Sequence, residues 1–195
     1  MPRYLGQHFL INKNKIKKII DVLELKSGDA IIEIGPGHGE LTSELVNWLN
    51  GELERKTKSK AILIEKDNLL AANLKKRFIE NKKIKVINGD VLKILPDLIN
   101  QLTNQPINYK LVGNIPYYIT GYLLRIIGEL ENKPSLIVLT VQKEVAERTA
   151  AKPPKMNLLA ASVQFWAKPE IIGYIPRKDF SPPPKVDSAI IKLVI

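Results

Sequence analysis

The sequence of 195 residues contains no cysteine and only two histidines, His8 and His38. Without cysteine, the chain has no disulfide bond, no thiolate nucleophile and no cysteine-based zinc site. Two histidines are also too few for a histidine-rich metal centre. We therefore expect a function that uses neither a bound metal nor a thiol.

Long hydrophobic runs are absent as well. No apolar stretch approaches the roughly 20 residues of a transmembrane helix, and the amino terminus, Met1-Pro2-Arg3-Tyr4, lacks the apolar core of a signal peptide. The hydrophobic fraction of 45% argues against disorder, and the length fits one domain over residues 1–195. These features predict a soluble, cytoplasmic, monomeric protein without a membrane partner.

Positively charged residues are in excess. The chain carries 30 lysines and arginines against 20 aspartates and glutamates, a formal net charge of +10. Such a surplus favours a polyanionic partner, because neutralising phosphates releases condensed counterions. The alternative is a general bias toward lysine that serves solubility.

The stretch 30–42 organises the rest of the chain. Ile31, Ile32 and Ile34 predict a buried strand, and the glycines that follow it at alternate positions are Gly35, Gly37 and Gly39. Glycine permits a sharp turn and lets a ligand approach the backbone, while the next helix directs free amides toward that ligand. The turn therefore predicts a nucleotide site.

The spacing of these glycines disfavours NAD, because Glu40 stands where the dinucleotide pattern G-x-G-x-x-G needs its third glycine. The pattern present, Glu33-x-Gly35-x-Gly37-x-Gly39, resembles the S-adenosylmethionine loop of class I methyltransferases. The alternative is a glycine-rich turn with no ligand.

Two further strands end in acidic residues. Ala61–Asp67 predicts a second strand, and Glu65 near its carboxyl end is the candidate acceptor for both ribose hydroxyls, despite a long spacing that a loop over 51–60 would explain. A third strand over 84–87 leads to Asp90, which could accept a hydrogen bond from an adenine amino group or merely cap the next turn.

The most informative tetrapeptide is Asn114-Ile115-Pro116-Tyr117, at the end of a fourth strand. The exocyclic amine of adenine is a poor nucleophile, and two acceptors that hold its hydrogens would free its lone pair. The Asn114 side chain and the Ile115 carbonyl would be these acceptors, Pro116 would stiffen the turn, and Tyr117 would offer a ring face to the base. The alternative is an ordinary proline turn with a core tyrosine.

The remaining pattern predicts three more strands and a series of helices. Pro96 is expected to break or restart a weak helix over 92–102, and Pro176–Lys185 is expected to form a stiff polyproline segment that presents Phe180 to a ligand. The helices are expected near 16–23, 41–49, 69–78, 119–130, 142–148 and 158–166, and the strands over 135–141, 170–175 and 187–195.

In this order, seven motifs closely resemble the rRNA adenine dimethyltransferase family. They are G-Q-H-F-L, E-I-G-P-G-H-G, I-E-K-D, G-D, N-I-P-Y, Q-K-E-V-A-E-R and F-S-P-P-P-K-V-D-S-A, and they span essentially the whole chain. The bacterial branch that dimethylates two adjacent adenines near the 3′ end of 16S rRNA looks nearest, and the macrolide-resistance 23S enzymes are the sister branch.

This resemblance implies a fold, a cofactor and a site. The fold would be an α/β, Rossmann-like, class I methyltransferase domain with a seven-stranded, mostly parallel sheet whose last strand is antiparallel. The cofactor would be S-adenosylmethionine, with S-adenosylhomocysteine as product, and the partner rRNA within a small-subunit precursor. Cofactor contacts would come from His8, Leu10, Gly35, Gly37, Gly39, Glu65, Lys66, Asp90, Val91 and Asn114, and contacts to the target adenine from Asn114, Ile115, Pro116, Tyr117 and Phe180.

The chain departs from the family pattern at two places. His8 stands where the family usually has asparagine. The sequence also stops at Ile195, whereas family members usually add a small helical domain that helps to hold rRNA. The resemblance thus covers a catalytic domain over residues 1–195. A non-catalytic RNA-binding or assembly protein with the same fold is the alternative from another functional class.

Overall fold

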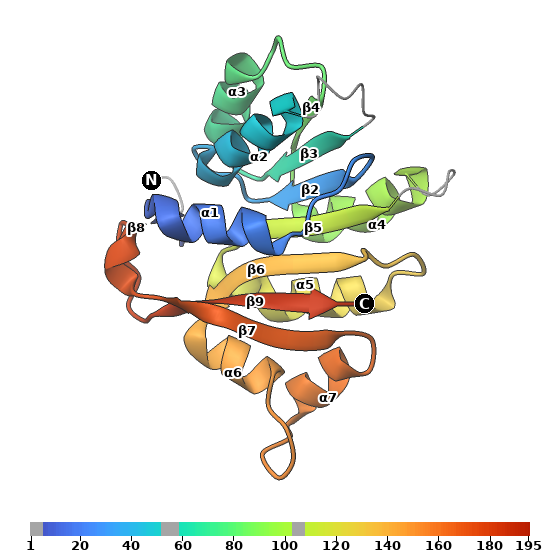
Figure 1. The fold of residues 1–195 in the computed structure, drawn as a ribbon, viewed down its shortest axis with the longest axis vertical. Helices are drawn as coiled ribbons and strands as arrows, with labels where there is room; N and C mark the ends of the chain where they lie inside the picture. The colour runs from blue at the N-terminus through green and yellow to red at the C-terminus, as the bar shows by residue number, and fades with distance from the viewer. Residues whose placement is uncertain (1–5, 52–58, 103–107) are drawn as a thin grey trace.

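The structure is a computed structural model that describes residues 6–51, 59–102 and 108–195. The loop expected over 51–60 lies largely outside these residues. The chain folds into a twisted sheet of seven strands in the order β4-β3-β2-β5-β6-β9-β7 (Figure 1). The first five strands of that order are parallel, whereas β9 runs antiparallel to both of its neighbours. The predicted fold class is confirmed.

Each strand of this sheet corresponds to an apolar run in the sequence. The bounds are β2 Ala30–Ile34, β3 Lys60–Glu65, β4 Ile84–Asn88, β5 Tyr109–Asn114, β6 Leu136–Gln142, β7 Lys168–Ile175 and β9 Ser188–Val194. The central strands are covered on both faces, so they consist of continuous rather than alternating apolar residues.

Helices cover both faces of the sheet (Figure 1). One face is packed by α1 (Lys13–Val22), capped by Asn12, and by α2 (Glu40–Gly51), with α3 (Asn68–Arg77) beside β3 and β4. The opposite face is packed by α4 (Val91–Leu102), α5 (Thr120–Glu129), α6 (Lys143–Thr149) and α7 (Leu158–Gln164). Each layer encloses its own apolar cluster.

Pro96 does not break α4, contrary to the sequence prediction. The helix continues from Val91 through Pro96 to Leu102. Leu95, Leu98 and Ile99 on either side of the proline are buried against the sheet. Burial of this apolar face outweighs the one backbone hydrogen bond that proline cannot make.

The expected polyproline segment is also different in the structure. A short 3-10 turn over Arg177–Asp179 leads into a two-residue strand, β8 (Phe180–Ser181). This strand pairs antiparallel with β1 (Phe9–Leu10), an element that the sequence did not reveal. Cross-strand pairing of these distant segments replaces the free, stiff rod that the prolines suggested.

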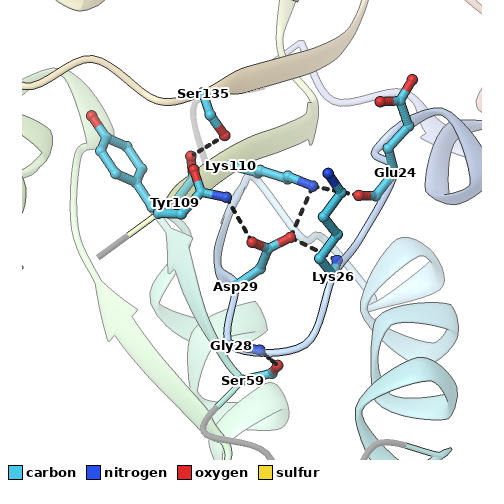
Figure 2. A network of polar contacts seen from close by, with 9 residues as sticks. Glu24, Lys26, Gly28, Asp29, Ser59, Tyr109, Lys110 and Ser135 are labelled. Carbon is cyan, nitrogen blue, oxygen red and sulfur yellow. Dashed lines mark hydrogen bonds and ion pairs between the residues drawn. The ribbon is translucent and has the colours of Figure 1, made fainter. Parts of the chain in front are cut away.

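A buried polar network joins strands at the amino ends of the sheet (Figure 2). The Lys110 ammonium lies 2.8 Å from the Asp29 carboxylate, and both side chains are about 95% buried or more. Lys110 also donates to the Glu24 carbonyl, and Asn108 donates to the other oxygen of Asp29. The backbone amide of Lys26 completes the set of donors to Asp29. These contacts fix the start of β2 against β5, at the opposite edge from the cleft described next.

Candidate active site

The carboxyl ends of β2, β3, β4 and β5 meet at one edge of the sheet and line a cleft of about 940 Å³, including its open mouth. This edge is where strand order reverses between β2 and β5, the position at which doubly wound sheets bind ligands. The cleft brings together every residue predicted for the site except Gly39 and Phe180. Residues far apart in the sequence thus form one site.

The glycine turn follows β2 directly and forms one wall of the cleft. Gly35 and Gly37 have φ angles of +63° and +61°, which side chains rarely adopt. A Cβ atom on Gly35 would lie 3.7 Å from the Asn114 carbonyl oxygen, and one on Gly37 would lie 2.8 Å from the Phe9 ring. The turn therefore lies directly beside the end of β5, as the sequence analysis required.

Gly39 is the exception among the three glycines. A Cβ atom there would approach Leu74 and Arg77 of α3 at 3.1 and 3.2 Å. Gly39 does not line the cleft in the described structure. The need for glycine at position 39 is explained by a φ of +89° and by close packing against α3.

Glu65, at the end of β3, is buried and holds the glycine turn in place. One carboxylate oxygen accepts the Gly37 amide at 3.0 Å, and the other accepts the Asp67 amide at 2.8 Å. Burial raises the pKa of Glu65 above its ordinary value, although these two amides oppose the shift. Glu65 also lines the cleft, and each of its carboxylate oxygens can accept more than one hydrogen bond.

Asp90 sits at the start of α4 and makes the helix-capping contact that was one of its two predicted roles. One oxygen accepts the Leu92 amide at 3.1 Å, which caps the helix. The other pairs with the Lys66 ammonium at 2.9 Å. Burial raises the pKa of Asp90, but these donors outweigh it and the pKa is lowered overall. Asp90 is therefore a charged acceptor on the cleft wall.

Glu33 is a residue of the cleft to which the sequence analysis assigned no role. Its side chain is fully buried, and one oxygen accepts the Thr42 hydroxyl at 2.8 Å. The other oxygen has no partner within the described residues. Burial raises the pKa of Glu33 to about 8. The sequence feature that could have identified Glu33 is a carboxylate inside an otherwise apolar strand, where an uncompensated charge is costly.

Asn114 is oriented by the amino-terminal segment. Its side-chain amide nitrogen donates to the His8 carbonyl at 2.7 Å, and the side chain makes no other hydrogen bond among the described residues. The amide oxygen is thereby available as an acceptor in the cleft. Ile115, whose side chain is buried, and Pro116 follow in the same wall. The NIPY turn thus carries an oriented amide beside the glycine turn.

The amino-terminal segment Gly6–Ile11, which we call the strap, closes one side of the cleft. The Phe9 ring lies 4.3 Å from the His38 ring of the glycine turn, measured between centroids.

The strap also contacts the segment at β8. The His8 ring bonds through Nδ1 to the Pro182 carbonyl at 2.8 Å, and Leu10 pairs with Phe180 across β1 and β8. The strap therefore connects the glycine turn, Asn114 and the segment after β8.

Phe180 is not presented to the cleft, in contrast to the sequence prediction. Its side chain is 2% exposed and belongs to the apolar cluster beneath α1 and α2. The antiparallel pairing with Leu10 draws Phe180 inward, because burying an aromatic ring gains more than exposing it. The structure places the Tyr117 and His8 rings near the cleft, with centroids 5.9 Å apart.

No group of three or more histidine, aspartate or glutamate side chains among the described residues is placed to hold a metal ion. No helix in the same part of the chain is long and apolar enough to cross a membrane.

Comparison with known proteins connects this cleft to a family. Residues 2–195 match the family model described as ribosomal RNA adenine dimethylase. A protein of Dehalococcoides mccartyi named ribosomal RNA small subunit methyltransferase A is 42% identical over 98% of this chain. Its counterpart of the same name in Prochlorococcus marinus is 40% identical over 96% of the chain.

Two solved structures are similar as well. The crystal structure of a dimethyladenosine transferase from Plasmodium falciparum superposes with a TM-score of 0.78, at 31% identity over 96% of this chain and 63% of that one. The 23S rRNA methyltransferase ErmE gives a TM-score of 0.77, at 28% identity over 95% of this chain and 69% of that one.

The relatives are longer than this chain. This chain spans 62% of the Dehalococcoides protein and 63% of the Prochlorococcus protein. The family model covers nearly every residue of the chain, including all the cleft residues described above. The chain belongs to the ribosomal RNA adenine dimethylase family.

Proposed function

We propose that this protein transfers methyl groups from S-adenosylmethionine to the exocyclic amine of adenine in ribosomal RNA. The observation that carries the proposal is the Asn114 amide, held by the His8 carbonyl so that its oxygen is available beside the glycine turn. The relatives are named for small-subunit ribosomal RNA and for dimethyladenosine. With the motif resemblance, we propose two adjacent adenines near the 3′ end of 16S rRNA, in a small-subunit precursor in the cytoplasm, as the target.

The cleft fits the proposed cofactor on two independent observations. One oxygen of buried Glu33 has no partner among the described residues, and it is an acceptor that suits the ammonium group of the cofactor's methionyl part. The lack of a side chain at Gly35 leaves the backbone of the turn accessible beside Asn114 and Pro116, which a Cβ atom there would approach to 3.7 and 4.0 Å. S-adenosylmethionine supplies an activated methyl group on a sulfonium centre when bound. Glu65 would accept the ribose hydroxyls and Asp90 the adenine amine.

The residues after β5 would activate the acceptor nitrogen. The Asn114 oxygen and the Ile115 carbonyl would accept its two hydrogens, which concentrates the lone pair on nitrogen. Pro116 restricts Ile115 to extended geometry, and the Tyr117 ring would support the flipped base. No strong general base is required, because the nitrogen loses its proton readily once it carries the added methyl group.

Phe180 has a different proposed role from the one expected. We propose that it stabilises the pairing of β1 with β8 and so holds the strap. A direct contact between Phe180 and the adenine would require the side chain to leave its buried position in the cluster beneath α1 and α2.

The test uses unmethylated 30S particles and labelled S-adenosylmethionine, with nucleosides analysed by mass spectrometry. We expect N6-methylated adenine with the parent chain and a loss of about 10²- to 10³-fold in rate with Asn114→Ala, as for other oriented donors and acceptors. Asn47→Ala, on the exposed side of α2, is the matched control. Label only on cytosine or protein would overturn the assignment.

A full-length relative must be assayed in parallel, because this chain spans 62% of such a protein. If only the relative methylated RNA, the lack of activity in this chain would be explained by the part of the relative that this chain does not share. The similarity to ErmE makes 23S rRNA the second substrate to test. The net charge of +10 favours a non-catalytic RNA-binding module as the other alternative, and that reading predicts RNA binding by the parent without methylation.

A further inference from the structure

Tyr117 makes one contact that the proposed chemistry does not use. Its phenol oxygen lies 2.7 Å from the hydroxyl of Ser188, the first residue of β9. Ser188 is fully buried and does not line the cleft, whereas Tyr117 does. A buried hydroxyl therefore holds the end of a ring that lines the cleft.

Neighbouring strands hold Ser188 in place. It lies between Gln142 of β6 and Ile175 of β7 in the sheet register. The preceding residue, Asp187, accepts the Arg177 amide through its side chain at 2.9 Å and the Lys143 amide through its carbonyl at 3.0 Å. The position of the Ser188 hydroxyl is therefore fixed by strands on both sides.

The ring of Tyr117 needs such a support. It is half-buried and lines the cleft, in the 3-10 turn Tyr117–Ile119, which is too short to fix a large side chain by itself. Burial raises the pKa of Tyr117, so the phenol stays protonated and hydrogen-bonded near neutral pH. The tilted His8 ring lies 5.9 Å from the Tyr117 ring, measured between centroids.

We propose that Ser188 is a positioning residue, which sets the plane of the Tyr117 ring so that a flipped adenine can stack on it beside Asn114. This inference rests on the proposed function, because it assumes that a base enters the cleft. Ser188 acts through the phenol and would not touch RNA or cofactor. The sequence places Ser188 71 positions after Tyr117, so only the tertiary structure suggests the pair.

A double-mutant cycle tests the proposal with Ser188→Ala, Tyr117→Phe and the double variant. One neutral hydrogen bond corresponds to a rate change of about 10-fold, and we expect each single variant to lose about that much. The double variant should lose no more than either single one, because all three lack the same bond. Additive losses, or a parental rate in Tyr117→Phe, would overturn the inference.

A second readout does not depend on turnover. An RNA hairpin with 2-aminopurine at the target adenine reports stacking by its fluorescence. Bound to the parent chain, the probe should be quenched by the tyrosine ring, and Ser188→Ala should raise its emission while the affinity for S-adenosylmethionine stays unchanged. Equal emission in parent and variant would contradict the proposal even if both proteins failed to methylate RNA.

Ser135→Ala is the control for loss of a serine hydroxyl. The Ser135 hydroxyl donates to the Tyr109 carbonyl at 3.4 Å, at the opposite edge of the sheet (Figure 2). This variant should match the parent in both readouts. If Ser188→Ala failed to fold, Tyr117→Phe would remove the same hydrogen bond from the exposed side and decide the question. Absence of adenine methylation in the parent would instead count against the proposed function.

Discussion

Glu33 illustrates how one buried side chain affects both stability and binding. The carboxyl is enclosed at the end of β2 with one oxygen unpartnered among the described residues. Burial is the main reason for its raised pKa, because water that would solvate the charge is excluded. A cationic group bound in the cleft would supply the missing partner, so ligand binding and ionisation of Glu33 are expected to be linked.

The first prediction concerns the pH dependence of stability without ligand. The pKa of Glu33 is about 8 in the folded chain against 4.5 in the unfolded chain. Unfolding therefore releases a proton between these values, and the free energy of unfolding should fall as pH rises from about 4.5 to 8. The contribution is at most about 5 kcal/mol, at about 1.4 kcal/mol per pKa unit. Urea unfolding at pH 5.5 and 8.5 measures it.

Glu33→Gln removes this ionisation and should flatten the pH dependence. Glu80→Gln, at an exposed position of the chain, should behave as the parent. Identical pH dependence in the parent and in Glu33→Gln would show that the Glu33 carboxyl does not carry the effect.

The second prediction concerns Gly37. Alanine there would need an unfavourable φ of +61° and would place Cβ 2.8 Å from the Phe9 ring, so the strap must move. We expect a loss of about 1–3 kcal/mol in stability and at least about 10-fold weaker binding of S-adenosylmethionine, about 1.4 kcal/mol. Calorimetric titration and thermal melting measure both.

Gly121→Ala is the matched control for Gly37→Ala. A Cβ atom at Gly121 in α5 meets nothing within 4 Å, and the helix favours alanine. Stability should stay the same or rise slightly, and cofactor binding should not change. Equal effects of the two substitutions would refute a specific role for the space at Gly37.

At the scale of elements, the Asp29 and Lys110 pair joins β2 to β5 at the edge opposite the cleft (Figure 2). Lys110→Met would leave the Asp29 carboxylate buried with fewer donors, and we expect destabilisation of about 3–5 kcal/mol. Because the cleft lies at the other ends of these strands, cofactor affinity of the folded fraction should be retained. Denaturant unfolding and ligand titration measure the two quantities.

The exposed pair Lys17 and Asp21 gives the control for this prediction. Its side chains are 70% and 60% exposed, so Lys17→Met should change stability by less than about 1 kcal/mol. A similar loss in both variants would mean that burial of the Asp29 pair is not what matters. Partial recovery in Asp29→Asn combined with Lys110→Met would support the role of the unpaired charge.

Sequence patterns identified elements well where the signal was local. The apolar runs predicted all seven strands of the main sheet. They failed where a distant partner decided the outcome. Pro96 stays within α4 because the sheet buries its neighbours, and Phe180 turns inward because β1 pairs with β8.

At the scale of the whole molecule, the net charge of +10 predicts salt-dependent binding to RNA. If the chain neutralises about four phosphates of a single-stranded target, the logarithm of affinity should fall against the logarithm of salt concentration with a slope of about −3. Filter binding of a 16S rRNA fragment between about 50 and 300 mM salt measures the slope. Affinity insensitive to salt would contradict an electrostatic contribution.

The sequence by itself determined the seven-stranded class I methyltransferase fold and most of the cleft. Strand ends are encoded locally, by apolar runs that stop at a glycine, an acid or the NIPY turn, and parallel topology brings those ends to one edge. Only the tertiary structure decided which groups are paired there. The His8 carbonyl on Asn114, the Ser188 hydroxyl on Tyr117 and the unpartnered oxygen of Glu33 depend on contacts between distant segments, which no local pattern records.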